Sequence, residues 1–285
     1  MIKNKNDKKR GTEQTRRIMK TKQDRKHILS ANSGFFLQEA YKTLRTNVNF
    51  ALANKEGCKV VMITSSLQGE GKSLTALNLA IALGQTDKKV LLIDCDLRRP
   101  KLARLLNLSA SAGLSNLLMD FNLLNSALIS SEEYGIDLIL AGDIPPNPAE
   151  LLSSTRMQKF LSALREHYDY IIIDSPPVDL VVDPVVLSAQ CDGVLFVVRA
   201  GQSERGAVIH AMKQLAYSKA NVIGFAFNDV TAETTSGYGK YRYRKYGKYR
   251  RYSRYGRYGY HYGYGYGQQE SHAEAYQGES KTDKQ

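Results

Sequence analysis

The sequence has few cysteines and no long apolar run. Its three cysteines, Cys58, Cys95 and Cys191, stand far apart without a Cys-x-x-Cys pair, so neither a disulfide framework nor a zinc site is predicted. We expect them to be reduced and buried in or beside strands, although the position of Cys95 between Asp94 and Asp96 leaves an oxidation-sensitive site as the alternative. No apolar stretch approaches the roughly 20 residues that span a bilayer, and the first residues lack the apolar core of a signal peptide. We therefore expect a cytoplasmic chain that reaches a membrane only through a partner or its basic ends.

The net charge of +12 lies in the two ends of the chain. Residues 1–30 contain eleven Lys and Arg against three acids, residues 238–267 contain nine against none, and residues 31–237 contain 18 against 21. The middle has enough apolar residues for one core, so we predict one globular domain at residues 33–230. Residues 1–32 are predicted to be a basic flexible arm, which either only aids solubility or is attracted to an anionic membrane surface.

The last part of the chain cannot form a core, because it consists almost entirely of Tyr, Gly, Lys and Arg. Thirteen of the 18 tyrosines follow residue 237. Low-complexity sequence of this kind cannot bury its aromatic rings, so residues 231–285 are predicted to be a disordered tail. Twelve of the tail tyrosines form a dense cluster: Tyr238, Tyr241, Tyr243, Tyr246, Tyr249, Tyr252, Tyr255, Tyr258, Tyr260, Tyr262, Tyr264 and Tyr266.

Residues 66–73, Ser-Leu-Gln-Gly-Glu-Gly-Lys-Ser, are typical of a phosphate-binding loop. They lie between an apolar, β-branched run at residues 60–64 and an apolar run with helical spacing. A loop in that position points backbone N–H groups and a helix N-terminus at an anion. Lys72 can then reach the outer phosphates of a nucleotide, and the Ser73 hydroxyl can hold Mg²⁺. The usual Walker pattern begins with Gly, where this chain has Ser66, so the loop alone is an imperfect match.

Acidic residues follow two other apolar runs. Asp94 and Asp96 end the run at residues 91–93, and Asp174 ends the run at residues 170–173. Each acid alone could be an ordinary turn residue. Because buried parallel strands deliver ligands at their carboxyl ends, we expect all three acids to converge with Lys72 on one crevice.

Strand-like and helix-like segments alternate along the middle of the chain. This alternation predicts an α/β domain with a mostly parallel central sheet flanked by helices. Helices are predicted at residues 33–54, after the phosphate loop, around residues 102–118, and from residue 149 onward. Strands are predicted at residues 60–64, 89–94, 136–140, 170–174, 194–199 and 222–228.

The first predicted helix carries a charged stripe. Glu39, Lys42 and Arg45 fall at positions i, i+3 and i+6. These side chains can pair within the helix, pair across a subunit boundary, or simply face solvent.

Taken together, these motifs resemble those of the bacterial tyrosine kinases of the two-component Firmicute type, which regulate capsular or extracellular polysaccharide synthesis. The resemblance runs from about residue 38 to residue 230 and includes the tyrosine tail. Its markers are residues 39–47, the loop, residues 94–100 (Asp-Cys-Asp-Leu-Arg-Arg-Pro), residues 147–152 (Asn-Pro-Ala-Glu-Leu-Leu) and residues 174–177 (Asp-Ser-Pro-Pro). Two positions depart from the family pattern. Gln68 stands where Pro is usual, and Lys42 stands where the assembly motif usually has Arg, whose planar fork Lys lacks.

The resemblance implies the P-loop NTPase fold of the partition and cell-division ATPases, with ATP and Mg²⁺ as cofactors. Lys72 would stabilise charge on the transferred phosphoryl group, and Asp96 would accept or orient the tyrosine hydroxyl. Ser73, Asp94 and Asp174 would place Mg²⁺ directly or through water. The twelve tail tyrosines would be the phosphate acceptors. The residues implied to contact the nucleotide are Ser66, Gln68, Gly69, Glu70, Gly71, Lys72, Ser73, Leu74 and Asn228.

The resemblance also implies partners. They are a separate transmembrane adaptor of the polysaccharide chain-length type, a cognate tyrosine phosphatase, and further copies of the chain in a ring when it is unphosphorylated. The ring contacts would involve Glu39, Lys42 and Arg45. The adaptor would recruit the cytoplasmic chain to the inner face of the membrane.

Two other functions are alternatives for this sequence. A partition or cell-division ATPase of the same fold would carry a signature Lys where this chain has Leu67. Nucleic-acid binding by the tail would combine stacking of Tyr on bases with neutralisation of phosphates by Arg, and it would weaken steeply with salt. The tyrosine cluster and Leu67 favour the kinase.

Overall fold

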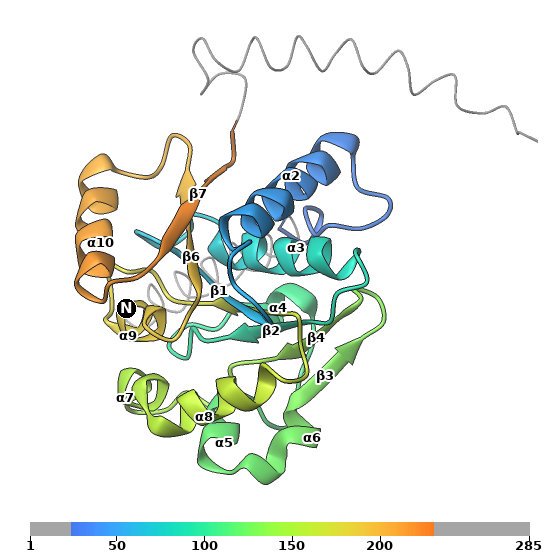
Figure 1. The fold of residues 1–285 in the computed structure, drawn as a ribbon, viewed down its shortest axis with the longest axis vertical. Helices are drawn as coiled ribbons and strands as arrows, with labels where there is room; N and C mark the ends of the chain where they lie inside the picture. The colour runs from blue at the N-terminus through green and yellow to red at the C-terminus, as the bar shows by residue number, and fades with distance from the viewer. Residues whose placement is uncertain (1–23, 231–285) are drawn as a thin grey trace, which may run out of the picture. The chain divides into compact units, whose positions relative to one another are not determined.

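A seven-stranded sheet organises residues 24–230, the part of the chain that the computed structural model describes. Its strand order is β3-β4-β2-β5-β1-β6-β7 (Figure 1). Only β3 runs antiparallel to its neighbour β4, and every other neighbouring pair is parallel. The strands are β1 (Lys59–Ser65), β2 (Val90–Asp94), β3 (Leu128–Ser131), β4 (Ile136–Ile139), β5 (Tyr170–Asp174), β6 (Gly193–Arg199) and β7 (Val222–Asn228).

The central strands are buried on both faces, which explains why they read as continuous apolar runs. All five residues of β2 and of β5 are buried. Alternate side chains of β1 enter two separate cores: Val60 and Met62 lie in one, and Val61 and Ile63 lie in the other. Val61 and Ile63 pack beside α2 (Phe35–Ala51), α3 (Lys72–Gly84) and α4 (Leu102–Leu106).

The opposite face of the sheet is covered by helices that follow α4 in the chain. Figure 1 shows α2 and α3 on one side of the sheet and α8 on the other. A 3₁₀ turn, η1 (Phe121–Leu123), precedes α6. The helices that follow α4 are α5 (Leu114–Met119), α6 (Leu124–Ala127), α7 (Pro148–Ser153), α8 (Thr155–Leu164), α9 (Asp183–Ser188) and α10 (Arg205–Tyr217).

The predicted mostly parallel α/β sheet is confirmed, and three local features differ from the sequence-based expectations. The helix expected around residues 102–118 is two helices, because Asn107 adopts a left-handed conformation (φ 58°) that ends α4. The short edge strand β3 was not predicted. Part of the predicted basic arm packs against the domain: Leu29 is buried, and its N–H donates to Asn78 Oδ1 at 2.8 Å.

The rest of that arm, residues 1–23, and the predicted tail, residues 231–285, lie outside the described residues. Between residues 24 and 230, no helix is both long enough and apolar enough to cross a bilayer.

Candidate active site

The phosphate loop connects the end of β1 to the start of α3 and requires glycine at two positions. Gly69 and Gly71 have φ angles of 86° and 96°, in the left-handed region that other residues rarely adopt. A Cβ at Gly71 would also lie 1.9 Å from Asn228 Nδ2. The close approach of β7 therefore allows only glycine at the residue that precedes α3. The predicted nucleotide contacts in residues 66–74 all lie on this loop or on the first turn of α3.

The carboxylate of Glu70 stabilises the phosphate loop through hydrogen bonds within it. Glu70 is 1% exposed, and it accepts hydrogen bonds from Ser66 Oγ at 2.9 and 3.1 Å and from the Leu67 N–H at 2.7 Å. It also accepts one from Ser203 Oγ, which follows β6. The Ser66 hydroxyl, at the position where the Walker pattern has Gly, thus serves as an internal partner of Glu70.

Two strands hold the loop from outside. Asn228 Nδ2, at the end of β7, donates to the Glu70 carbonyl at 2.9 Å, and Arg199 Nη1, at the end of β6, donates to the Gly69 carbonyl at 2.8 Å. Arg199 also pairs with Asp229 at 2.7 Å. Asn228 therefore lies beside the phosphate loop, as its predicted contact with the nucleotide requires.

Lys72 brings the loop into contact with the acids at the ends of β2 and β5. Its Nζ donates to Asp96 Oδ2 at 3.2 Å, to Asp174 Oδ1 at 3.4 Å and to Ser73 Oγ at 3.4 Å. Asp94 and Asp174 face each other in register on neighbouring strands. The structure thus brings together the residues that the sequence predicted to converge.

Burial and the charges of neighbouring side chains shift the pKa values of Lys72, Asp94 and Asp174. Burial alone would lower the pKa of Lys72, but the charges of Asp174, Asp96 and Asp94 outweigh it and raise that pKa. Burial, reinforced by the charge of Asp174, raises the pKa of Asp94 to about 7. Burial also raises the pKa of Asp174, against the opposing charge of Lys72. The site concentrates negative charge around one buried cation, which is a setting that favours a further cation.

The donors present fit Mg²⁺, which prefers oxygen ligands and usually takes only one or two carboxylates beside phosphates and waters. Asp174 Oδ2 is buried without a hydrogen-bond partner among the described residues, so it has a lone pair to offer. Asp94 accepts N–H bonds from Asp96 at 3.1 Å, Lys101 at 3.2 Å and Leu102 at 3.1 Å. Nowhere in residues 24–230 do three His, Cys, Asp or Glu side chains form a ready-made metal cage. This arrangement is consistent with a metal that arrives with a nucleotide.

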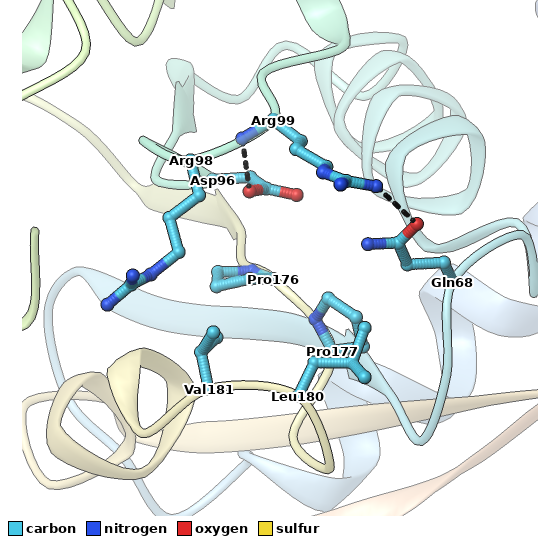
Figure 2. Close-up of a pocket in the computed structure, with 8 residues that line it drawn as sticks. All are labelled: Gln68, Asp96, Arg98, Arg99, Pro176, Pro177, Leu180 and Val181. Atoms are coloured by element: carbon cyan, nitrogen blue, oxygen red, sulfur yellow. Dashed lines mark hydrogen bonds between the residues drawn. The ribbon is translucent and has the colours of Figure 1, made fainter.

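A pocket of about 320 Å³ opens beside Asp96 (Figure 2). Pro177 and Leu180 form an apolar side, and Gln68 and Arg99 lie on the opposite side. The sequence motifs predict no role for Arg99 or Leu180. The signal that could have found this pocket is the Pro176–Pro177 pair after β5, which forces the chain into a rigid turn beside the acid.

The remaining predicted residues are placed as follows. Within α2, Lys42 Nζ pairs with Glu39 at 2.8 Å, and Arg45 Nη1 donates to the Ala82 carbonyl of α3 at 2.6 Å. These are contacts within one chain. The tail tyrosines lie outside the described residues.

The three cysteines are free, and burial raises the thiol pKa of each. Cys95 is fully buried, with the charges of Asp94 and Asp174 disfavouring its thiolate further. Because the thiolate is the reactive form, this environment argues against the oxidation-sensitive alternative at Cys95.

Comparisons with known proteins show the family to which this chain belongs. A family model described as an AAA domain matches residues 58–221. The tyrosine-protein kinase YwqD of Bacillus subtilis (strain 168) is 40% identical over 203 residues, which cover 71% of this chain and 85% of YwqD. The chain belongs to the bacterial tyrosine-protein kinases.

Among solved structures, a tyrosine kinase domain is more similar to this chain than a septum site-determining protein of the same fold is. The kinase domain of the Escherichia coli tyrosine kinase ETK has a TM-score of 0.67 and 35% identity, covering 71% of this chain and 79% of that one. The septum site-determining protein MinD of Pyrococcus horikoshii OT3, solved with Mg-ADP, has a TM-score of 0.51 and 21% identity, covering 59% and 69%. MinD therefore shares the fold alone with this bacterial tyrosine kinase.

Proposed function

We propose that this bacterial tyrosine kinase uses ATP and Mg²⁺ to phosphorylate its own C-terminal tyrosine cluster and thereby regulates capsular or extracellular polysaccharide synthesis. The observation that carries the proposal is the buried contact of Lys72 with Asp96 and Asp174 at the phosphate loop. A cation that can face the outer phosphates lies next to a carboxylate that can face an acceptor hydroxyl. That pair is what phosphoryl transfer to an alcohol or phenol requires.

In the proposed reaction, a tyrosine oxygen forms a bond to the γ-phosphorus as the bond between that phosphorus and the β–γ bridging oxygen breaks. ADP leaves with the bridging oxygen. Asp96 accepts the phenolic proton and releases it to solvent, while Lys72 neutralises charge on the transferred group. Ser73, Asp94 and Asp174 would hold Mg²⁺, which supplies charge neutralisation at the phosphates. Catalysis of this kind is mostly positioning, so no protein nucleophile is needed.

We infer from the length of the tail that it reaches this site. Because β7 is parallel to β6, its carboxyl end lies at the same edge of the sheet as the phosphate loop, and Asn228 contacts the loop there. Between Val230 and Tyr266 there are 36 residues, and a flexible chain of that length has an r.m.s. reach of roughly 33 Å. This span allows phosphorylation of the chain's own tail or of a neighbour's tail.

The proposed partners follow from the family. They are a transmembrane adaptor of the polysaccharide chain-length type that recruits the chain to the cytoplasmic face of the membrane, a tyrosine phosphatase, and other copies in a ring. In the isolated chain, Glu39 pairs with Lys42 and Arg45 contacts Ala82. Ring formation through α2 would therefore have to exchange these contacts for contacts between subunits.

The proposal is tested by incubating three forms of the full chain with Mg-ATP, with and without a membrane fraction of the cells that encode it. The forms are the wild type, Lys72→Met, and a variant in which the twelve clustered tail tyrosines are Phe. Anti-phosphotyrosine blotting should give a strong wild-type signal, at least about 100-fold less signal for Lys72→Met, and no signal for the Phe variant. Binding of ATP by the Phe variant should match that of the wild type. No wild-type signal under either condition would refute the proposal.

A further inference from the structure

The residues that line the pocket beside Asp96 are those of a binding site for one aromatic side chain. We call it the acceptor groove and define it by Gln68, Asp96, Arg99, Pro177 and Leu180. Its volume of about 320 Å³ is at the lower end of the range for small-ligand pockets, which is roughly 300–1,000 Å³. A site of this volume can hold a single aromatic side chain.

The groove runs from a half-exposed rim to a recessed acid. Leu180 at the rim is 50% exposed, whereas Asp96 is only 4% exposed. Asp96 also connects the groove to the phosphate loop, since its Oδ2 accepts from Lys72 Nζ at 3.2 Å and its Oδ1 accepts from the Arg99 N–H at 3.0 Å. A hydroxyl that meets Asp96 from the groove is therefore next to the cation that would face the transferred phosphate.

The two arginines of the turn after β2 have different surroundings. Arg98 forms two hydrogen bonds, at 2.8 and 2.9 Å, with the carboxylate of Asp183, which is fully buried. Its guanidinium is therefore neutralised and held. Arg99 is exposed, and its Nη1 donates to Gln68 Oε1 at 3.2 Å. Figure 2 shows this Arg99–Gln68 contact across the groove from Pro177 and Leu180.

We propose that Arg99 and Leu180 select tyrosine as the acceptor by holding its ring between the guanidinium and the apolar side, and that Gln68 is the positioning residue for Arg99. The ring face of an aromatic residue attracts a cation, and its edges pack on proline and leucine. A serine or threonine side chain offers no aromatic face to Arg99. The Gln68 side chain supplies an acceptor for Arg99, which a proline at this position would not provide.

The occupant is a tyrosine from residues 238–266 of this chain, either its own or that of a second copy. The tail begins where β7 ends, at the edge of the sheet that carries the groove, and its length allows it to reach this edge. Asp183 already offsets the charge of Arg98, so of the two guanidiniums only that of Arg99 repels the nine Lys and Arg of the tail. The attraction between Arg99 and the ring face acts against that repulsion. This inference rests on the proposed function, since it names the acceptor site of that reaction.

The test compares Leu180→Asn with Val182→Asn in the full chain. Both replace an exposed aliphatic side chain, 50% and 53% exposed, in the same segment, but Val182 does not line the groove. The probe is a labelled peptide with the sequence of residues 255–267, with matched peptides in which every Tyr is Ala or Ser. Binding is followed by fluorescence anisotropy in the presence of ADP and Mg²⁺, and ADP affinity is measured separately.

We expect Leu180→Asn and Arg99→Met to raise the Kd for the tyrosine peptide by about fivefold or more, with the Kd for ADP changed by less than about twofold. Val182→Asn should bind the peptide as the wild type does. The Ala and Ser peptides should bind weakly to every form. For Gln68, Gln68→Glu should keep peptide binding and Gln68→Leu should weaken it, because only Glu keeps an acceptor for Arg99.

Two results would overturn the inference. One is equal peptide affinity of Leu180→Asn and Val182→Asn, and the other is binding of the Ala peptide as tightly as the tyrosine peptide. Because this assay measures binding, it is independent of phosphate transfer. The chain could bind the tyrosine peptide through Leu180 and yet show no kinase activity. That result would refute the proposed function but would still support the groove as a binding site for tyrosine.

Discussion

At the scale of single residues, Ser66 and Glu70 explain why an imperfect Walker sequence still forms a phosphate loop. The Ser66 hydroxyl donates to the Glu70 carboxylate, which also accepts the Leu67 N–H. A buried carboxylate of this kind is stabilised by several charge-assisted hydrogen bonds. The sequence predicted the loop but not the hydrogen bonds of Glu70 within it. One of the donors to the Glu70 carboxylate, Ser203, is distant in the chain.

Gly71→Ala is expected to weaken ATP binding by at least about tenfold, because a Cβ at 1.9 Å from Asn228 Nδ2 would displace the end of β7 from the loop. The measurement is titration calorimetry with ATP and Mg²⁺. Gly57→Ala is the control, since Gly57 also has a positive φ (68°) but a Cβ there would meet nothing within 4 Å. Both variants should lose about 1–2 kcal/mol of stability from backbone strain, and Gly71→Ala should lose more because its Cβ also displaces the end of β7. Only Gly71→Ala should lose ATP affinity. Equal ATP affinity of the two variants would contradict this reasoning.

At the scale of elements, the strands were predicted well because their apolar runs are long and β-branched. The predicted range 170–174 coincides with β5, and 222–228 coincides with β7. Prediction failed where the pattern is short or interrupted. β3 has only four residues and lies at the sheet edge, and the interruption between α4 and α5 depends on the left-handed Asn107.

Asp192 joins several elements where β6 begins. It accepts hydrogen bonds from Arg165, the C-cap of α8, at 2.7 Å and from the Val60 N–H of β1 at 2.8 Å, and it pairs with Lys55 at 3.0 Å. Burial alone would raise the pKa of Asp192, but these three hydrogen bonds outweigh it and hold that pKa below its ordinary value. Asp192 therefore stabilises the fold chiefly as an anion.

Asp192→Asn is expected to lower the free energy of unfolding at pH 7 by about 2 kcal/mol, because it removes charge-assisted hydrogen bonds between elements. A lowered folded-state pKa means that the contribution is present above the unfolded pKa of about 3.9 and is lost as the pH falls through the folded pKa. The difference from wild type should thus be constant from pH 6 to 8 and shrink below about pH 4. Urea denaturation across this pH range measures it.

The control for this prediction is Asp169→Asn. The Asp169 side chain is 41% exposed and pairs with Lys88, which is 50% exposed, at 3.3 Å. A solvent-exposed pair of this kind is worth less than about 1 kcal/mol. If Asp169→Asn lowers the free energy of unfolding as much as Asp192→Asn does, burial does not determine how much each carboxylate contributes to stability.

At the scale of the whole molecule, charge is divided between a body with more acids than bases and two basic ends. Residues 238–267 carry nine Lys and Arg and no acids. Each phosphate adds about −1.5 to −2 charge, so roughly five or six phosphotyrosines would cancel the basic charge of this segment. We therefore expect phosphorylation to reverse the sign of the tail and release any acidic surface that it holds.

This expectation is tested by measuring assembly size with light scattering, and affinity for anionic vesicles, as the number of phosphotyrosines increases. Assembly size and vesicle affinity should both fall most steeply near five or six phosphates per chain. The Phe variant of the tail incubated with Mg-ATP is the control and should show no change. If neither quantity depends on the number of phosphates, the charge-reversal hypothesis is wrong.

The sequence by itself determined the parallel α/β class, the phosphate loop and the acids that end β2 and β5, because apolar periodicity and strand-end chemistry are local properties of the chain. Only the tertiary structure decided which of these residues meet. The strand order places β5 between β2 and β1, which sets Asp174 beside Asp94 and within reach of Lys72. It also brings Arg199 to the loop, and the turns after β2 and β5 form the acceptor groove. Contacts between residues so far apart depend on strand order and packing, which no local pattern encodes.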